Sequence, residues 1–501
     1  MKKTIIAASL TALAMGPAFA AINPHNEAMG KETTYDEKSD NQKGKLTGGW
    51  YYQEENVQEN TDLNHGSVST NITLTGGSFD ELIGGNHIKQ PTYKEGTHNV
   101  TIGDTKVTMT GGSVEYFIGG SKANNSDKTT LITGDVTAVI SGGSIGNQSS
   151  TSEYPVSAIG GSYVKSTGNP GEGTPASTTA ETGNISLSIS GGTFYGAVFG
   201  GSVADNYGST EGQKPILKNI SGISELKIQG GKFESSKFGV FGGSAAIGMK
   251  SATTSSGSSV SINNTSETLI DIVGRVVGGD LLTYGGSGEN ATSSKINGST
   301  SVSITGSGEI KTSESVIGGS LLNKDEESSS TISGTSEIVI DAANAVLGDE
   351  VIGGSYVRTQ KDTGDASASV KGTSVTIKAG TINGNVVGGG KVNGKHGTVE
   401  SSVDGDTVIS IFGGTVNGAV IGGGHAKIGD GTSGDMSADV TGTSRIQITG
   451  GTVNGVIGGG LSYAYGTNGA DWKSTASVGK SEVIITGGTI EAVNYVATGP
   501  K

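Results

Sequence analysis

Two pairs of aspartates are the residues whose types and spacing could do acid–base chemistry. Asp404 is close to Asp406, and Asp430 is close to Asp435. An enzyme that cuts polysaccharides on a β-helix needs carboxylates that converge on one face of successive coils. Both pairs lie in Gly/Ser-rich stretches, where aspartate often bonds to its own turn backbone. The sequence therefore favours solvated turns here, and we predict no catalytic residues and no enzyme activity.

The histidines are the next candidates, because imidazole carries protons and binds metals. His425 follows three glycines at an expected corner, and we predict that it is a plain surface histidine. The stretch from Gly285 to Asn290 is similar to the Gly-Gly-x-Gly-x-Asp calcium repeat, but that motif needs tandem copies to close a site. None of the six histidines is spaced as metal ligands usually are; they are His25, His65, His87, His98, His396 and His425. We predict neither a metal site nor a cofactor-binding site.

Repeats are the elements that position these residues. After residue 66 the chain returns to one unit, most clearly in Thr415-Val-Asn-Gly-Ala-Val-Ile-Gly-Gly-Gly424. Eleven copies of its second Gly-Gly pair follow one another at intervals of 34 to 42 residues, and a degenerate twelfth unit begins at Ser481. The pairs begin at Gly84, Gly119, Gly160, Gly200, Gly242, Gly278, Gly318, Gly353, Gly388, Gly422 and Gly458.

Within a unit, apolar and polar residues alternate. Val375 and Ile377 would face one way while Thr376 and Lys378 face the other. This period of two, rich in β-branched residues, is typical of half-buried strands. One unit buries too little apolar surface to stand alone, so the units must stack. We therefore predict an all-β chain that forms a single elongated β-solenoid of about 11–12 repeats.

The glycines and the insertions describe the corners of this solenoid. Gly-Gly pairs allow positive φ and a close approach of stacked backbones. Asn417-Gly418 and its equivalents predict turns, but Asn-Gly is also a strong hairpin signal, so stacked hairpins remain an alternative. Insertions at residues 165–181, 205–214, 251–258 and 324–330 are expected to be loops at one edge. The number of coils in each repeat stays open.

The ends of the chain indicate its compartment. Residues 1–20 have a basic start, a short apolar stretch and Ala18-Phe-Ala20, which is the pattern of a bacterial secretory signal. We predict that residues 21–66 form an N-terminal cap or flexible arm and that residues 67–501 form the repeat domain. The chain has no cysteine, and its net charge of −14 disfavours nucleic acid as a partner.

The signal sequence, the absence of cysteine and the unit at residues 413–424 make the chain resemble the passenger region of bacterial autotransporter adhesins. The resemblance covers about residues 67–498. It implies a right-handed parallel β-helix at the cell surface or outside the cell, with a role in adhesion, aggregation or biofilm formation. The expected partners are glycans or proteins of host or bacterial surfaces, other copies of the chain, and an outer-membrane translocator.

One feature departs from that family. Its members usually end in a membrane β-barrel, whereas this sequence stops at Gly499-Pro-Lys501 within or just after a repeat. We interpret this as truncation. A carbohydrate-active β-helix enzyme and a purely structural secreted rod remain the alternative functions. An enzyme would need one irreplaceable cluster of Asp and Arg, and no unit stands out in that way.

Overall fold

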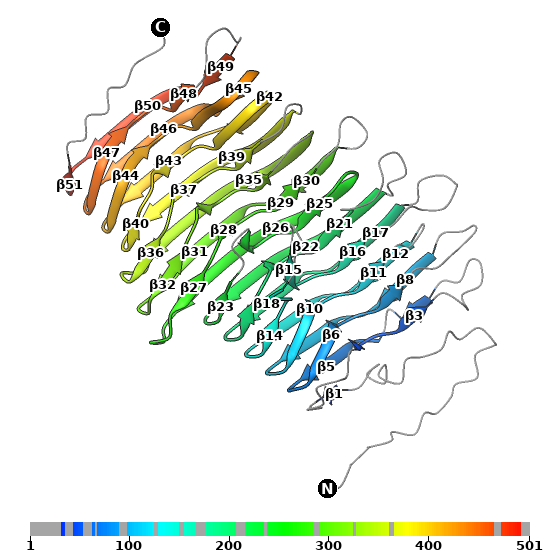
Figure 1. The fold of residues 1–501 in the computed structure, drawn as a ribbon. Helices are drawn as coiled ribbons and strands as arrows, with labels where there is room; N and C mark the ends of the chain where they lie inside the picture. Colours follow the sequence, from blue (N-terminus) through cyan, green and yellow to red (C-terminus); the bar gives the residue numbers. More distant parts are fainter. Residues whose placement is uncertain are drawn as a thin grey trace, which may run out of the picture.

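The chain folds as one elongated β-solenoid, in which parallel strands of successive turns stack on one another. The computed structural model describes residues 32–35, 44–53, 63–65, 68–89, 98–124, 129–149, 155–166, 177–206, 216–234, 238–284, 291–323, 327–359, 365–464 and 472–491. These residues form a β-solenoid of about 10 turns, which follow the sequence from one end of the rod to the other (Figure 1). No helix occurs among the described residues. The predicted all-β solenoid is therefore confirmed.

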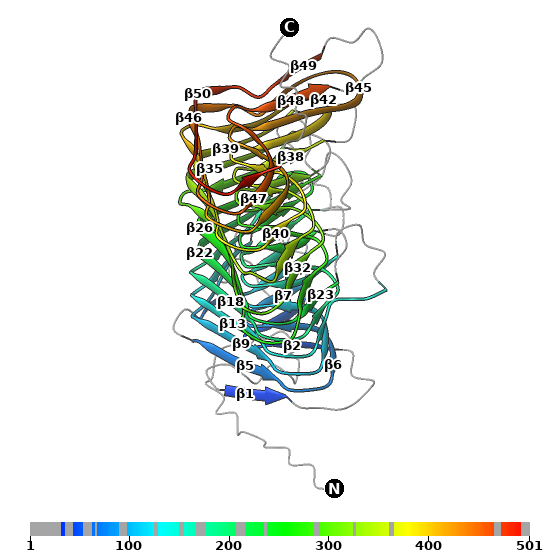
Figure 2. The same cartoon turned by 90° about the vertical axis from the view of Figure 1, so that its left-hand side faces the viewer.

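Two sheets make up the solenoid, and they face each other across it (Figure 2). The larger sheet has 31 strands among the described residues, and each of its strands lies directly beside an equivalent strand of the next turn. In several turns, the weaker strand predicted before a unit is continuous with the first strand of that unit, and the two form one long strand. No helix of the described chain is long and apolar enough to span a membrane.

The strands of the larger sheet fall into four groups. Short strands that follow a Gly-Gly corner are β3(Tyr51–Gln53), β7(His87–Lys89), β11(Lys122–Asn124), β16(Tyr163–Lys165), β21(Val203–Asp205), β25(Ala245–Ile247), β29(Leu281–Thr283), β34(Leu321–Asn323), β38(Tyr356–Arg358) and β48(Leu461–Ala464). The next strands along the turn are β4(Leu63–His65), β8(His98–Ile102), β12(Thr129–Thr133), β17(Ser177–Thr182), β30(Thr292–Ile296) and β49(Trp472–Thr475). The third strands are β1(Glu32–Tyr35), β5(Thr70–Leu74), β9(Thr105–Met109), β13(Val136–Ile140), β18(Ile185–Ile189), β31(Thr300–Gly306), β43(Thr407–Ile411), β46(Val440–Ile448) and β50(Val478–Ile485). Joined strands are β22(Ile216–Ile228), β26(Ser251–Asn264), β35(Ser328–Asp341), β39(Ala366–Ile377), β42(Lys391–Val403) and β45(His425–Ser437).

The smaller sheet consists of shorter strands, most of which precede the second Gly-Gly pair of their unit. They are β2(Lys45–Thr47), β6(Ser78–Ile83), β10(Ser113–Ile118), β14(Ser144–Ile145), β15(Val156–Ile159), β19(Thr193–Phe194), β20(Ala197–Phe199), β23(Lys232–Phe233), β24(Gly239–Phe241), β27(Ile270–Ile272), β28(Arg275–Val277), β32(Ile310–Thr312), β33(Val316–Ile317), β36(Ala345–Leu347), β37(Val351–Ile352), β40(Thr381–Ile382), β41(Val386–Val387), β44(Thr415–Ile421), β47(Thr452–Ile457) and β51(Thr489–Ile490). β10 pairs with both β14 and β15 of the next turn, and β44 pairs with both β40 and β41 of the preceding turn. In the turns between β10 and β44, the smaller sheet therefore has two short strands per turn, which form two parallel ladders.

The register places equivalent residues of successive repeats side by side. Val375 of β39 pairs with Ile409 of β43, which pairs with Ile446 of β46. All described strand pairs are parallel, in contrast to the antiparallel pairs that hairpins would form, so the alternative of stacked hairpins is wrong. Each repeat supplies one turn, which settles the number of coils.

The core follows the predicted alternation. Ile409 and Ile411 are buried in the main hydrophobic cluster, while Val408 and Ser410 between them are less buried. On the opposite sheet, Val416 and Val420 of β44 enter the same cluster. The apolar residues of both sheets therefore meet in one continuous column along the rod, as stacked repeats require.

The two Gly-Gly corners need glycine for different reasons. At the first corner Gly112 has φ +82°, a conformation in which a Cβ is strained. At the second corner a Cβ on Gly119 would lie 2.0 Å from the carbonyl oxygen of Gly160 in the next turn. Asn417-Gly418, predicted as a turn, lies instead within β44, where the Asn417 amide donates to Asn383 Oδ1 of the preceding turn at 3.0 Å.

Hydroxyl side chains satisfy the backbone at the second corner. The Thr105 hydroxyl donates to the Gly119 carbonyl at 2.9 Å, and Thr373 does the same to Gly388 at 2.6 Å. The Ser121 N–H, just after the corner, donates to the Ser162 hydroxyl of the next turn at 3.2 Å. These bonds matter because an unpaired buried backbone group is costly.

Two segments that the sequence predicted to be loops are wholly or partly strands in the structure. Residues 251–258, expected to be a loop, belong to β26, and residues 328–330 of another expected loop belong to β35. Gly48-Gly49 forms a corner of the repeat type that the sequence analysis did not detect, since its N–H groups donate to the Ile83 and Gly85 carbonyls. The predicted secretory signal, residues 1–20, lies outside the described residues.

Candidate functional site

The aspartates singled out from the sequence serve the backbone of the solenoid. Asp406 lies in the turn between β42 and β43, and its Oδ1 accepts the Thr443 N–H of the next turn at 2.7 Å. Asp404 lies in the same turn, with its N–H donating to the Val370 carbonyl. Asp435 is exposed on β45, whereas the side chain of Asp430 lies outside the described residues. The bond from Asp406 agrees with the turn interpretation of this pair.

The same type of bond recurs near the N-terminal end. Asp104 Oδ1 accepts the Asp135 N–H at 2.9 Å, and Asp135 Oδ1 accepts the Asn184 N–H at 2.7 Å. Asn184 Oδ1 then accepts the Ile223 N–H at 3.0 Å. A side-chain ladder of this kind ties each of these turns to the next through one side-chain oxygen atom.

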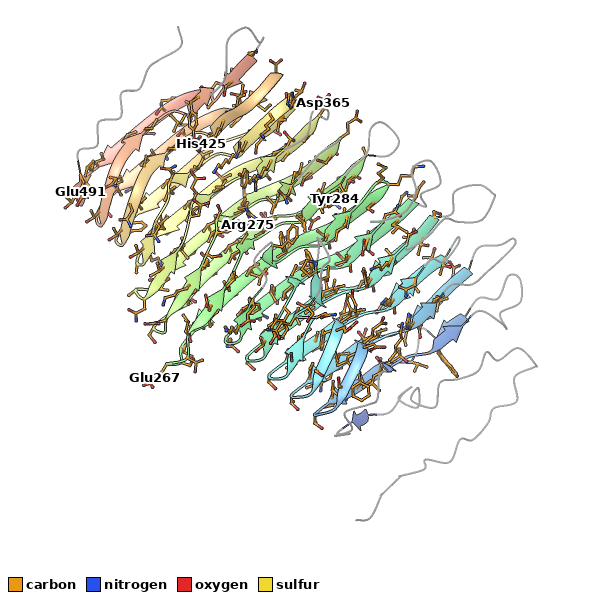
Figure 3. The ribbon with its side chains drawn as sticks, in the orientation of Figure 1. Glu267, Arg275, Tyr284, Asp365, His425 and Glu491 are labelled. Atoms are coloured by element: carbon orange, nitrogen blue, oxygen red, sulfur yellow. The ribbon has the colours of Figure 1, made fainter. Side chains whose placement is uncertain are left out.

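Three histidines are buried in the described structure, and one of them was predicted to lie at the surface. His425 is only 3% exposed, so its prediction as a surface histidine is wrong, and Figure 3 places it within the body of the rod. His87 is fully buried, and His396 is also buried. Of the remaining three, His25 lies outside the described residues, as do the side chains of His65 and His98.

His87 and His425 belong to one row of side chains beside the second Gly-Gly corner. The residue at the start of each following strand pairs in register with its equivalent: Lys122 with His87 and Tyr163, and Lys391 with Tyr356 and His425. The middle of the row is apolar and packs against Phe199, Phe241 and their equivalents in a second hydrophobic cluster. Charged side chains therefore flank an apolar centre on both sides, and we treat the two charged groups as the candidate sites.

The N-terminal charge cluster consists of Lys45, Glu81, His87 and Lys122. Glu81 Oε1 lies 2.8 Å from Lys122 Nζ and 3.1 Å from Lys45 Nζ, and its Oε2 lies 3.8 Å from His87 Nδ1. Burial raises the pKa of Glu81, but the charges of Lys122 and Lys45 outweigh it and leave the pKa below its usual value. Burial lowers the pKa of Lys122 to about 8, although Glu81 opposes that shift.

Tyrosines extend this cluster towards the next turns. Lys122 Nζ lies 5.3 Å from the ring centre of Tyr116 and 5.1 Å from that of Tyr163. The Tyr163 hydroxyl donates to Asp205 at 2.7 Å, and Asp205 also pairs with Lys165 at 3.4 Å. Carboxylates and aromatic faces beside the row thus contact its buried cation, which offsets the cost of burying that charge.

The C-terminal charge cluster repeats this chemistry with Glu350, Asn385, Lys391 and His425. Glu350 is paired with Lys391, accepts the Asn385 amide at 2.7 Å and lies 3.6 Å from His425 Nδ1. Burial raises the pKa of Glu350, but His425 and Lys391 together lower it to about 2. The pKa of Lys391 is raised, because its burial is outweighed by Tyr356 and Glu350.

In each cluster a carboxylate is paired with a lysine, and the paired groups expose little surface that a ligand could contact. Glu350 is 5% exposed, and Glu81 is 6% exposed. Their carboxylates are bound by neighbouring cations, so neither group is set up as a general acid near neutral pH. Among the described residues, no group of three His, Cys, Asp or Glu residues could hold a metal ion. The clusters were missed because only the turn-by-turn alignment brings Glu350 beside Lys391 and His425.

Asp280 is a further buried acid that the sequence analysis did not identify. It occupies the position of Ser121 in its own turn, directly after the second Gly-Gly pair. Its Oδ1 accepts the Ser244 N–H at 2.6 Å, and its Oδ2 accepts the hydroxyls of Ser294 and Thr253 at 2.5 and 2.9 Å. Burial raises the pKa of Asp280 despite these bonds.

The hydroxyl face is the outward-facing counterpart of these buried groups: Ser329, Thr331 and Ser367 are exposed in it, and its other members are half-buried. It lies on the outward side of β26, β30, β31, β35 and β39, where serines and threonines predominate around Lys295, Glu337 and Val339. Ser259 pairs with Ser301, and Ser261 pairs with Ser303. The face is defined by Ser259, Ser261, Ser293, Ser301, Ser303, Ser329, Thr331, Ser367 and Ser369.

Comparisons with known proteins give no relative. No protein-family model matches the chain, and no match was found among the curated proteins or the solved structures. The arguments for function therefore rest on the sequence and on the geometry of the solenoid.

Proposed function

We propose that the chain is an exported rod at the bacterial cell surface that acts in adhesion and self-association. The repeat solenoid supports this proposal, because its turns follow one another along an extended rod (Figure 1) and place equivalent residues side by side. The resemblance to autotransporter passengers and the secretory pattern at residues 1–20 point in the same direction.

The hydroxyl face is the observation that carries the proposal. Each serine or threonine hydroxyl can donate one hydrogen bond and accept others, which suits the hydroxyls of glycans and the polar groups of proteins. Adjacent strands of a sheet lie about 4.8 Å apart, so several hydroxyls can meet one extended partner. Each contact is weak, and simultaneous contacts raise the overall affinity. Surface glycans or proteins and other copies of the chain are the proposed partners.

Fractionation of native bacteria tests the proposal. An antibody against residues 67–498 is used to blot cell fractions with and without protease treatment of intact cells. We expect a band that protease removes, and a band well above the 50.0 kDa of this chain would reveal an attached translocator. A protease-resistant band confined to the cytoplasm would contradict the proposal.

The hydroxyl face is tested separately from export. In cells that display the rod, Ser259→Lys, Ser301→Lys and Ser367→Lys are combined, and cell settling and binding to glycan-coated surfaces are measured. We expect both to fall, because long charged side chains prevent close contact with the face. The matched control combines Thr73→Lys, Thr108→Lys and Thr137→Lys, which add the same three charges on the outward side of β5, β9 and β13, away from this face, and it should settle and bind as the unchanged chain does. Unchanged settling and binding of the triple variant would contradict a role for this face.

A further inference from the structure

The C-terminal charge cluster places a lysine and a side-chain amide on the two oxygens of one carboxylate. Glu350 Oε1 accepts the Asn385 amide at 2.7 Å, and Glu350 Oε2 is paired with Lys391 Nζ. The side chains of Glu350 and Lys391 are only 7% and 12% exposed, and Asn385 is half-buried. An amine and an amide therefore share one carboxylate at a place that is largely shielded from water.

The amide of Asn385 is also bound at its oxygen. The Ala419 N–H of the next turn donates to Asn385 Oδ1 at 2.9 Å. This bond and the bond to Glu350 fix which end of the amide faces which partner. A backbone N–H at a carbonyl oxygen stabilises the negative charge that develops there when a nucleophile adds to the carbonyl carbon. The amide is thus surrounded by an amine, a carboxylate and a donor to its oxygen.

The neighbours of Lys391 in the larger sheet cover this group. Tyr356 precedes Lys391 and His425 follows it in the register of successive turns. Lys391 Nζ lies 4.9 Å from the ring centre of Tyr356, and His425, labelled in Figure 3, lies 3.6 Å from Glu350. Side chains on both sides limit the access of water, which would otherwise compete with the amine as a nucleophile.

We propose that Lys391 and Asn385 form an intramolecular isopeptide bond, with Glu350 as the proton carrier. Glu350 Oε2 takes a proton from Lys391 Nζ, and the neutral amine adds to Asn385 Cγ. Glu350 gives that proton to Nδ2 and accepts a second proton from Nζ. The Nζ–Cγ bond then replaces the Cγ–Nδ2 bond, Nδ2 departs as ammonia, and ammonia takes the second proton from Glu350. No oxidant, reductant or cofactor is consumed.

The resting charges of the pair make this a slow reaction. Although burial raises the pKa of Glu350, His425 and Lys391 lower it to about 2, so the carboxylate is ionised. Burial lowers the pKa of Lys391, but Tyr356 and Glu350 outweigh it and raise this pKa. Glu350 therefore acts first as a base, and the reactive neutral pair arises by proton transfer between two groups already in contact. We expect each folded chain to react once.

The N-terminal charge cluster lacks one of the three groups. Glu81 and Lys122 stand at the same positions relative to the second Gly-Gly pair as the acid and the lysine of the C-terminal cluster, and they are paired at 2.8 Å. Tyr116 pairs in register with Glu81 and stands where the C-terminal cluster has Asn385. A tyrosine side chain has no carbonyl for an amine to attack. Lys122 therefore remains a free amine and is a control within the same chain.

The isopeptide bond staples the second Gly-Gly corner of its turn. Asn385 directly precedes β41 of the smaller sheet, and Lys391 begins β42 of the larger sheet, so the bond joins the two sheets across residues 385–391. The chain has no cysteine and cannot make such a link with a disulfide. An amide bond is not broken by reduction. This inference does not depend on the proposed role in adhesion.

Mass spectrometry of the folded full chain tests the bond. We expect the chain to be lighter, by one ammonia molecule, than its sequence and N-terminus require. After denaturation, trypsin should leave Lys391 uncut and release residues 379–395 as one cyclised peptide, whereas it should cut after Lys122. A succinimide at Asn385 has the same mass but leaves Lys391 open to trypsin. A chain of full mass, or one that trypsin cuts after Lys391, would overturn the proposal.

Substitutions in the cluster test the role of each group. Glu350→Gln keeps the size of the side chain but cannot carry the proton, and Lys391→Arg keeps the charge but removes the amine. Both variants should have full mass, with circular dichroism showing that they are folded. Glu81→Gln is the matched control, because it changes the other buried carboxylate and should leave the bond in place. A Glu350→Gln chain that still loses ammonia and resists cleavage after Lys391 would show that Glu350 is not the proton carrier.

Discussion

At the scale of residues, small hydroxyl side chains hold the corners of this solenoid together. The Ser162 N–H donates to the Ser202 hydroxyl at 3.0 Å, and the Ser320 N–H donates to the Ser355 hydroxyl at 3.1 Å. Asp280 interrupts this series with a carboxylate that has three donors and no cation among its described contacts. Burial of a charge costs more than burial of a hydroxyl, so this position is expected to limit stability near neutral pH.

Asp280→Asn should therefore stabilise the rod at pH 7. The amide keeps an acceptor for the Ser244 N–H and removes the charge, and we expect a gain of about 1 kcal/mol in the free energy of unfolding. The folded-state pKa of Asp280 is raised, so the wild type regains stability as pH falls through that pKa. The difference in the free energy of unfolding between Asp280→Asn and the wild type should therefore become smaller at acid pH.

Urea denaturation of both proteins at several pH values measures this difference. Ser320→Ala in the next turn is a control, because it removes a partner of the same series without changing charge. An advantage of Asp280→Asn that stays constant towards acid pH would contradict the electrostatic explanation.

At the scale of elements, the corners set how closely neighbouring turns approach. Gly119 and Gly160 stand at the same position of successive turns, and the Gly119 N–H donates to the Ile159 carbonyl at 2.9 Å. A Cβ at Gly119 would also lie 2.8 Å from Val136 Cγ1, so it would collide with both the next turn and the opposite strand. Backbone atoms cannot move away from it without breaking the ladder.

Gly119→Ala should lower the free energy of unfolding by about 1–3 kcal/mol, as overpacking of a core does. Gly372→Ala in β39 is the control, because its Cβ would meet no atom closer than 3.3 Å. The control should be nearly neutral. Chemical denaturation of the two variants provides the measurement, and equal losses would show that the close approach at the corner is not the cause.

At the scale of the whole molecule, contacts are made between neighbouring turns. The longest pairings join β22 to β26 and β35 to β39, which are successive turns of the same sheet. Such a stack behaves as a row of similar units whose stability depends on each unit and on its interfaces. The length of the rod should therefore be adjustable without loss of the fold.

Removal of one whole turn tests this property. Deletion of residues 278–317 joins Val277 to Gly318, so that the Ser244 N–H can meet the Ser320 hydroxyl and Asp280 is lost. We expect a folded rod that is about 4.8 Å shorter, the spacing of one strand. Circular dichroism and small-angle X-ray scattering measure fold and length. Deletion of residues 288–317 is the control, because it removes only part of a turn and should disrupt the register.

The sequence by itself determined the local elements of this protein. Alternation such as Val375 and Ile377 against Thr376 predicts strands without reference to the rest of the chain, because side chains of a strand point to opposite faces. The recurrence of the second Gly-Gly pair indicated stacked turns, because each unit is too small to be stable alone.

The tertiary structure alone decided which residues of different turns meet. Asn417-Gly418 is compatible with both a hairpin and a strand, and only the parallel register places it within β44. Glu350 is 41 residues from Lys391, and insertions of different length obscure that alignment in the sequence. The register is fixed by burial of one face of every strand, since a shift by one residue would expose the core. This alignment buries His425 and assembles each of the two charge clusters from residues of different turns.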